Sequence, residues 1–262
     1  MRSDHLRGRT GGGSRGRGGT RAVGVGAAVA AAGLTLLVVA GWRPLVAFDR
    51  RVVRGMHAHA VAHPSVTHVM RVLTDWFWDP WTMRALVAAA CLWLWRRGRG
   101  CCAVRIALLT LTASAVQQGL KALVGRERPV WPDPVDSAQY AAYPSGHAMT
   151  ATVVCGLLLW LVPRGAPRRY AYPARALVAV SVLGVGFTRL YLGVHWPTDV
   201  LAGWLLGVAL VALGTAVTLG TSVTLRAAAA PGAAVALAAP TAAGGACPGR
   251  SPVSPRADFP AR

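Results

Sequence analysis

Six apolar runs divide this chain of 262 residues, and each comes close to the length that crosses a lipid bilayer. A helix that spans a membrane needs about 20 apolar residues. With 54% hydrophobic and only 14% charged residues, the chain can place most of itself in lipid. The sequence therefore predicts an all-α fold, a six-transmembrane-helix bundle whose spans cover residues 22–42, 79–95, 103–124, 145–162, 176–194 and 198–219.

The second run is the weakest of the six, because residues 79–95 form a short stretch that includes Arg84. The preceding segment, residues 65–78, is predicted to be an amphipathic helix that lies in the membrane interface rather than across the bilayer. Tryptophan concentrates at the boundary between lipid and water. The residues that we expect to mark this boundary are Trp76, Trp78 and Trp81.

The two ends of the chain differ in composition from the apolar middle. Residues 1–21 are mainly Arg, Gly, Ser and Thr without an apolar period, which predicts a disordered basic cytoplasmic tail. Residues 226–262 are rich in Ala, Pro and Gly and are predicted to form a second disordered cytoplasmic tail. The membrane domain is therefore expected at residues 22–225, with the first run as an uncleaved span rather than a signal peptide.

The formal charge of +19 could suggest a nucleic-acid partner, but its distribution argues against one. Arginines follow the second, fourth and sixth runs and fill the N-terminal tail, as expected for loops on the cytoplasmic side. We therefore predict a multi-pass protein of the cell membrane with both termini cytoplasmic and no bound nucleic acid. The exception is the first outer loop, which carries Arg43, Arg50, Arg51 and Arg54.

Three polar clusters are expected on the opposite, extracytoplasmic face. The first combines Lys121, the single lysine among 28 basic residues, with Arg128. Pro129 disfavours helix at Arg128, so the end of the third run is predicted to unwind and bring the guanidinium closer to the ammonium. Taken alone, the cluster is also compatible with two cations that extend to lipid headgroups.

The second cluster opens the fourth run. Ser145 follows Pro144 and occupies a natural N-cap position, where free amides and the positive end of the helix dipole attract an anion. Gly146 permits close approach of a ligand to the backbone, and His147 lies in the first turn. Simple helix capping by Ser145 and an interfacial position for His147 are the alternatives.

The third cluster lies between the last two runs. Asp199 is the only carboxylate within or beside the last three spans, and His195 precedes it by four residues. A carboxylate that holds a histidine fixes its tautomer and makes the far nitrogen more nucleophilic. Arg189 would be costly at the end of a span unless it has an anion. The alternative for Asp199 is to cap backbone amides.

In order and spacing, these clusters resemble the three motifs of the phosphatidic acid phosphatase type 2 superfamily, in its membrane-bound lipid phosphatase branch. The resemblance covers residues 121–199, and Thr188 stands where the family usually has serine. It implies that His195 is the nucleophile, that Asp199 orients it and that His147 is the general acid and base. The phosphate-binding residues would be Lys121, Arg128, Ser145, Gly146 and Arg189.

The resemblance also implies a mechanism without cofactor or metal, and the composition is in keeping with it. The chain has only nine carboxylates, whereas a two-metal hydrolase would need several in its site. Glu127 is expected to pair with its neighbours Arg126 and Arg128. The histidines of the first outer loop are assigned to a solvated loop rather than a metal site; they are His57, His59 and His63.

The partners implied by the resemblance are the bilayer and a phosphorylated lipid. Candidate substrates are undecaprenyl pyrophosphate, phosphatidic acid and phosphatidylglycerol phosphate, and the sequence does not choose among them or define an oligomeric state. A phosphotransferase with the same phosphohistidine intermediate is an alternative. A non-catalytic anion transporter is another, although the chain shows no internal repeat.

Overall fold

This computed structural model describes residues 12–163 and 165–228, and the side chains of residues 18–163 and 165–217. The described part consists of helices and the loops that connect them, so the predicted all-α class is confirmed there. Residues 1–221 form one compact unit, and residues 222–262 form another whose described residues, 222–228, are helical.

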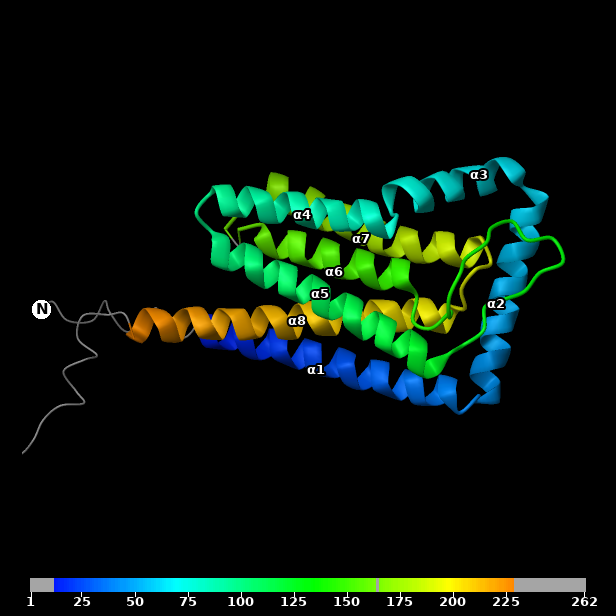
Figure 1. The fold of residues 1–262 in the computed structure, drawn as a ribbon, viewed down its shortest axis with the longest axis horizontal. Coiled ribbons are helices and arrows are strands. Elements are labelled where there is room, and N and C mark those ends of the chain that lie inside the picture. The colour runs from blue at the N-terminus through cyan, green and yellow to red at the C-terminus, as the bar shows by residue number, and fades with distance from the viewer. Residues whose placement is uncertain (1–11, 164, 229–262) are drawn as a thin grey trace, which may run out of the picture. The chain divides into compact units, whose positions relative to one another are not determined.

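Each of the six predicted runs coincides largely with a helix. The elements are α1 (Gly12–Val39), α2 (Arg43–Ala62), α3 (Pro64–Val72), the π-helical turn η1 (Leu73–Phe77), α4 (Pro80–Arg96), α5 (Gly100–Val124), α6 (Gly146–Leu161), α7 (Arg168–Tyr191) and α8 (Pro197–Ala228). The bundle helices lie roughly alongside one another, while α2 runs across their ends (Figure 1).

Four helical segments are long and apolar enough to cross a membrane, which makes this a multi-pass membrane protein. They are Gly18–Val39, Gly100–Val124, Arg168–Tyr191 and Pro197–Val217. The apolar helix α6 has only 16 residues, and α4 has 17. The structure thus supports several spans, while the count of six remains a prediction.

The helices at both ends extend beyond the predicted boundaries. Helix α1 begins at Gly12, so residues 12–21 are helical where a disordered tail was expected. Adding a residue to an existing helix forms one hydrogen bond without a new nucleation cost, which allows a polar segment to continue an apolar helix. The other expected tail residues, 1–11 and 229–262, lie outside the described part of the chain.

The segment between α1 and α4 is helical, and the expectation of a solvated loop around the histidines is wrong. Pro44 and Pro64 lie in the first turns of α2 and α3, where proline suits a helix. One face of α2 is buried and carries Asp49, Val53, His57 and Ala60. This spacing forms a stripe along one side of a helix, and the buried stripe holds α2 against the protein.

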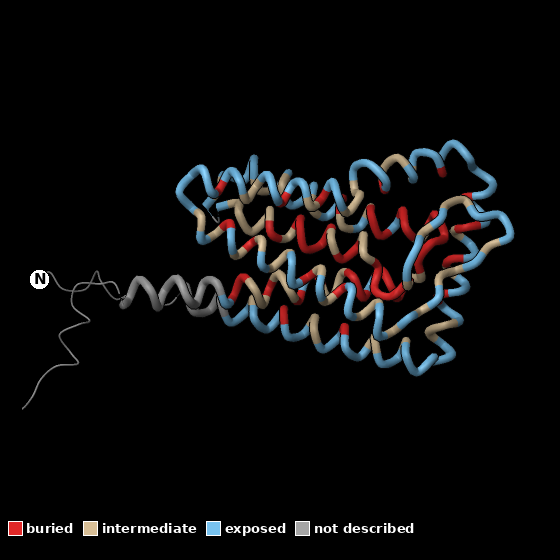
Figure 2. The backbone as a smooth tube through the Cα atoms, viewed as in Figure 1, coloured by how far each residue is buried: buried red, intermediate tan, exposed pale blue. Residues whose placement is uncertain are grey.

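Helix α6 forms the centre of the bundle and packs against α4, α5 and α7. Buried residues occur on several sides of it, as the red segments of the tube show (Figure 2). A helix that is apolar all round is stable where other helices surround it. The core side chains that it contributes are Met149, Val153, Val154 and Leu157.

Close packing of α8 against the start of α6 brings two of the predicted clusters together. A Cβ atom at Gly203 would lie 2.8 Å from the Ser145 carbonyl oxygen and 3.0 Å from the Met149 nitrogen. The backbone of Ser145 also donates a hydrogen bond of 2.9 Å to the carbonyl oxygen of Asp199. The two helices approach this closely because residue 203 has no side chain.

The change Gly203→Ala is expected to destabilise the protein by about 1–3 kcal/mol, because the new methyl group meets backbone that has no room to move. Gly119→Ala on α5 is the matched control, since a Cβ there would meet nothing within 4 Å. The thermal unfolding midpoint of protein purified in detergent, followed by tryptophan fluorescence, measures both. Equal midpoints for the two variants would contradict the proposed close contact.

Candidate active site

The three predicted clusters lie at one end of the bundle, where α5 ends and α6 and α8 begin. Helix α5 ends at Val124, and Gly125 closes it in the left-handed conformation with φ of 57°. The helix therefore stops before Arg128, as the proline at position 129 predicts. Lys121, in the last turn of α5, donates a hydrogen bond to the carbonyl oxygen of Ala141.

Arg128 binds two loops at once. Its Nε and Nη2 donate to the carbonyl oxygens of Tyr140 and Gln139, at 2.9 and 3.0 Å. Its Nη1 donates to the carbonyl oxygen of Val194 at 2.7 Å and lies 3.1 Å from Nε2 of His195. Because a guanidinium group offers several donors in one plane, Arg128 can fix both loops and still face the histidine.

These contacts define the protonation of His195. A guanidinium group has no acceptor, so Nε2 of His195 accepts from Arg128 with its lone pair. The proton then resides on Nδ1, which lies 3.4 Å from Oδ2 of Asp199. Burial of the ring and three nearby cationic side chains hold the pKa of His195 well below its usual range. The imidazole is therefore neutral, with a lone pair on the nitrogen that faces the cations.

Asp199 is fully buried, and its carboxylate is surrounded by donors. Oδ2 accepts from the backbone N–H of Trp196 at 2.9 Å as well as facing His195. Oδ1 accepts from Nη1 of Arg126 at 2.6 Å. Asp199 thus makes both contacts considered from the sequence, the histidine contact and the amide cap.

Arg126 is the main element that the sequence did not reveal. Its Nη1 contacts Asp199, and its Nη2 lies 2.7 Å from Oδ2 of Asp49 in α2. Asp49 is fully buried and also accepts from the Thr198 amide at 3.1 Å and the Thr198 hydroxyl at 2.6 Å. No sequence pattern links residues so far apart, although an unpaired acidic residue within α2 was an available signal.

The predicted pairing of Glu127 with its neighbouring arginines is wrong. Arg126 turns inward to Asp49 and Asp199, and Arg128 donates to backbone carbonyls. Glu127 is exposed, and among the described side chains it makes no ion pair. Neighbours in an extended segment point in different directions, so adjacency in sequence does not bring their side chains together.

The start of α6 presents unused polar groups to this region. Ser145 is the N-cap residue, as predicted, but its hydroxyl makes no capping hydrogen bond and is buried without a partner among the described residues. The first amides of a helix also lack intrahelical acceptors. His147 follows within electrostatic range of His195 and of the cationic side chains Lys121, Arg128 and Arg189. Together these groups form a site suited to an anion.

Arg189 is buried near the end of α7, with only 3% of its surface exposed. Its Nη1 lies 3.5 Å from Asp136 and 3.4 Å from the Thr74 hydroxyl, both long contacts, and its Nε has no partner among the described residues. The neighbouring hydroxyl of Thr188 donates to the Val185 carbonyl oxygen in its own helix. The guanidinium therefore keeps donors available for a ligand.

His57 does not face solvent but supports the loop that precedes His195. It is buried in α2, and its ring stacks on Trp131 with the centroids 4.0 Å apart. Burial lowers the pKa of His57, against the opposing effect of Asp133. Trp131 donates to the carbonyl oxygen of Gly193 at 2.8 Å. Within the described residues, no group of three His, Cys, Asp or Glu side chains is arranged to hold a metal ion.

The balance of charge in the site is positive. Burial and the proximity of Arg189 lower the pKa of Arg128 to about 10, which still leaves the guanidinium charged at neutral pH. Lys121 contributes a third cation, whereas the carboxylates close to this group are Asp199 and Asp136. Such a site can bind the oxygens of a phosphate group and place its phosphorus before a neutral imidazole.

Replacement of Asp49 by alanine is expected to lower the free energy of unfolding by about 3 kcal/mol, because it leaves Nη2 of Arg126 and the amide and hydroxyl of Thr198 without their acceptor. Asp49→Asn keeps one acceptor oxygen and should lower the free energy of unfolding by less. Glu127→Gln is the control, since Glu127 is exposed. The thermal unfolding midpoint in detergent measures the stability of all three variants. If Glu127→Gln lowered this midpoint as much as Asp49→Ala, the contacts of Asp49 with Arg126 and Thr198 would not be the stabilising ones.

Parts of this chain are similar to known phosphatases. An undecaprenyl-diphosphatase of Sulfolobus acidocaldarius is 38% identical over 76 residues, which cover 29% of this chain and 31% of that protein. A decaprenylphosphoryl-5-phosphoribose phosphatase of Mycolicibacterium smegmatis is 35% identical over 122 residues, which cover 45% of this chain and 61% of that protein. The chain thus matches less than two thirds of the length of either relative.

A solved structure shares the fold. The transmembrane PAP2-type phosphatidylglycerolphosphate phosphatase of Bacillus subtilis matches with a TM-score of 0.63 and 23% identity, over 73% of this chain and 96% of that one. Residues 102–221, which carry all three clusters, match the model of the PAP2 superfamily. Over these residues, the chain is therefore similar to the PAP2 superfamily.

Proposed function

We propose that this protein is a membrane phosphatase that hydrolyses a lipid phosphate or polyprenyl diphosphate through a phosphohistidine intermediate, without a metal ion. The observation that carries the proposal is the geometry around His195: Nδ1 lies 3.4 Å from Oδ2 of Asp199, and Nε2 lies 3.1 Å from Nη1 of Arg128, a donor that Nε2 can face only with its lone pair. A nucleophile needs such a lone pair, and the guanidinium beside it marks where a phosphate oxygen would bind.

In the first step, Nε2 of His195 attacks phosphorus, and the bond from phosphorus to the leaving oxygen of the lipid breaks. His147 gives its proton to that oxygen. Asp199 stabilises the positive charge that develops on the ring of His195. Arg128 exchanges its contact with Nε2 for the phosphoryl oxygens, which Lys121 and Arg189 also stabilise.

In the second step, water replaces the lipid. His147, now neutral, removes a proton from the water as its oxygen attacks phosphorus. The bond between phosphorus and Nε2 breaks, inorganic phosphate leaves, and His195 regains its lone pair. The amides at the start of α6, beside Ser145 and Gly146, stabilise the same equatorial oxygens throughout.

We place the site on the extracytoplasmic side of the cell membrane, with both termini cytoplasmic. Arg96, Arg97 and Arg99 lie where α4 meets α5, and α7 begins with further arginines; both lie at the end of the bundle away from the site (Figure 1). Loops rich in arginine favour the cytoplasmic side. With 16 residues, α6 is about 24 Å long and shorter than a bilayer core of about 30 Å, so its polar start can lie below the lipid headgroups.

The candidate substrates differ in what remains after hydrolysis. Undecaprenyl diphosphate, phosphatidylglycerol phosphate and decaprenylphosphoryl-5-phosphoribose, which correspond to the names of the similar proteins, each leave a lipid that still carries a phosphate group. Phosphatidic acid leaves diacylglycerol, which carries none. The residues that bind the scissile phosphate are the same for all four candidate lipids. Any preference of the protein for one of these lipids must therefore arise from contacts outside those residues.

His195→Ala is expected to reduce phosphate release by on the order of a thousandfold or more, because no other group replaces the nucleophile. His68→Ala removes an exposed histidine on α3 and is the control. Release of inorganic phosphate from the candidate lipids in detergent micelles measures the rate. Near-normal turnover by His195→Ala would refute the assigned nucleophile.

Phosphate release by the unmodified protein should continue at an undiminished rate in EDTA, because three cationic side chains stabilise the phosphoryl oxygens in the proposed mechanism. Loss of activity in EDTA that returns with a divalent ion would refute this mechanism. With lipid labelled at the scissile phosphate alone, label in a product other than inorganic phosphate would instead support the phosphotransferase alternative.

A further inference from the structure

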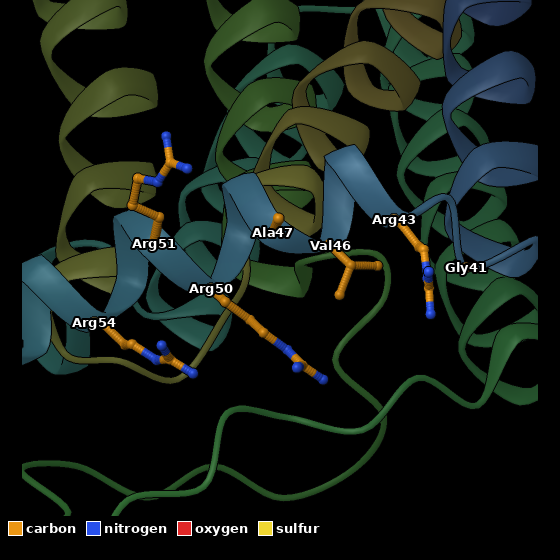
Figure 3. A pocket seen from close by; sticks show the side chains of 7 residues that line it. All are labelled: Gly41, Arg43, Val46, Ala47, Arg50, Arg51 and Arg54. Atoms are coloured by element: carbon orange, nitrogen blue, oxygen red, sulfur yellow. The ribbon is translucent and has the colours of Figure 1, made fainter.

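Helix α2 carries an arginine cluster, Arg43, Arg50, Arg51 and Arg54, at the end of the bundle where the charge pattern predicts few cations. All four are exposed, and among the described side chains none of them forms an ion pair. Together they border a hollow of about 780 Å³ along the helix, shown in Figure 3. Unpaired arginines around a concave surface favour an anionic ligand.

A second cavity, of about 410 Å³, lies between this cluster and Arg128 of the proposed active site. Arg50 and Val46 line both cavities. The second is also bordered by Arg128, whose guanidinium contacts His195 Nε2. Its other lining residues are Val38, Asp49, Arg126, Glu127 and Trp196. Arg50 is thus the arginine of the cluster that shares a cavity with the group proposed to bind the scissile phosphate.

The charges around this second cavity leave Arg50 available. Asp49 is buried, and its carboxylate accepts from Arg126 and Thr198 rather than from Arg50. Glu127 is exposed at the border and forms no ion pair with Arg50. The cavity therefore offers two guanidinium groups, Arg50 and Arg128, on walls that come from different parts of the chain.

We propose that Arg50 and this cavity bind a second phosphate group, the one that stays with the leaving lipid, while Arg128 and His195 bind the scissile phosphate. Arginine pairs with phosphate oxygens through two parallel hydrogen bonds, which fixes orientation as well as charge. The inference rests on the proposed function and narrows its substrate class to lipids with two phosphate groups. Phosphatidic acid, with a single phosphate, would leave the Arg50 cavity without its ligand.

The physical basis for selectivity is binding energy from a part of the substrate that does not react. Contacts to the second phosphate would hold the scissile phosphate in line with Nε2 of His195, which lowers the barrier for the lipids that carry it. A substrate without the second phosphate gains nothing from Arg50. Removal of Arg50 should therefore affect the two classes of lipid differently.

The decisive measurement is kcat/KM of Arg50→Gln with undecaprenyl diphosphate, phosphatidylglycerol phosphate and phosphatidic acid. We expect a loss of about 10- to 100-fold with the first two, the range for a charge-assisted hydrogen bond, and a change of less than about threefold with phosphatidic acid. Equal losses with all three lipids, or no loss with any, would overturn the proposal.

Arg51→Gln is the matched control, because it removes the same charge from the next position of α2. In Figure 3 the side chain of Arg51 extends away from those of Arg50 and Arg54, and Arg51 does not line the second cavity. It should leave the kcat/KM values of all three lipids nearly unchanged. A loss for Arg51→Gln that equals the loss for Arg50→Gln would mean that net charge, and not the Arg50 cavity, attracts the lipid.

Binding to an inactive protein separates this inference from the proposed function. In a His195→Ala background, thermal stabilisation by undecaprenyl diphosphate in detergent should fall when Arg50→Gln is added, while that by phosphatidic acid should not. Such a dependence supports the second site even if the unmodified protein hydrolyses none of these lipids. Identical binding with and without Arg50 would overturn the second site even if phosphatase activity is present.

Discussion

The buried carboxylate of Asp199 is the group around which the site is arranged. It is removed from water, so its charge must be met by donors, and it has three: the Trp196 amide, Arg126 and the Nδ1–H of His195. Arg126 carries a second charge contact to Asp49, which ties α2 to the start of α8. Removing any member leaves a buried charge or donor without a partner, which lowers the free energy of unfolding, so the network is stabilising only when all of its members are present.

The same network explains why α2 lies across the end of the bundle. A helix with Asp49 on its buried face would not pack against apolar helices, but Arg126 and the Thr198 amide offer the carboxylate two partners. Packing of α2 then places His57 on Trp131, which holds the loop before His195 through Gly193. The opposite face of α2 carries the exposed arginines. Their positive charges can bind the phosphate groups of a substrate.

Prediction from the sequence succeeded where the physical cause is local. The six apolar runs all coincide largely with helices, and α5 ends before Arg128, where the following proline disfavours helix and Gly125 has already closed it. It failed where partners come from afar. Glu127 was paired with its neighbours because they are adjacent, whereas the carboxylate that Arg126 selects lies in α2, far away in the sequence. The loop expected around His57 is helical because one of its faces finds a buried surface, which only the folded chain provides.

The sequence by itself determined that the chain is helical, that it belongs in a membrane, and which polar residues are candidates for a phosphate site, because apolar length, capping positions and motif spacing are properties of the linear chain. Only the tertiary structure decided how those residues meet. The direction of the Nε2 lone pair of His195 depends on Arg128, and the fixed position of Asp199 depends on Arg126 and Asp49. The position of Arg50 between two cavities depends on where α2 docks, and such contacts arise from packing in three dimensions rather than from spacing along the chain.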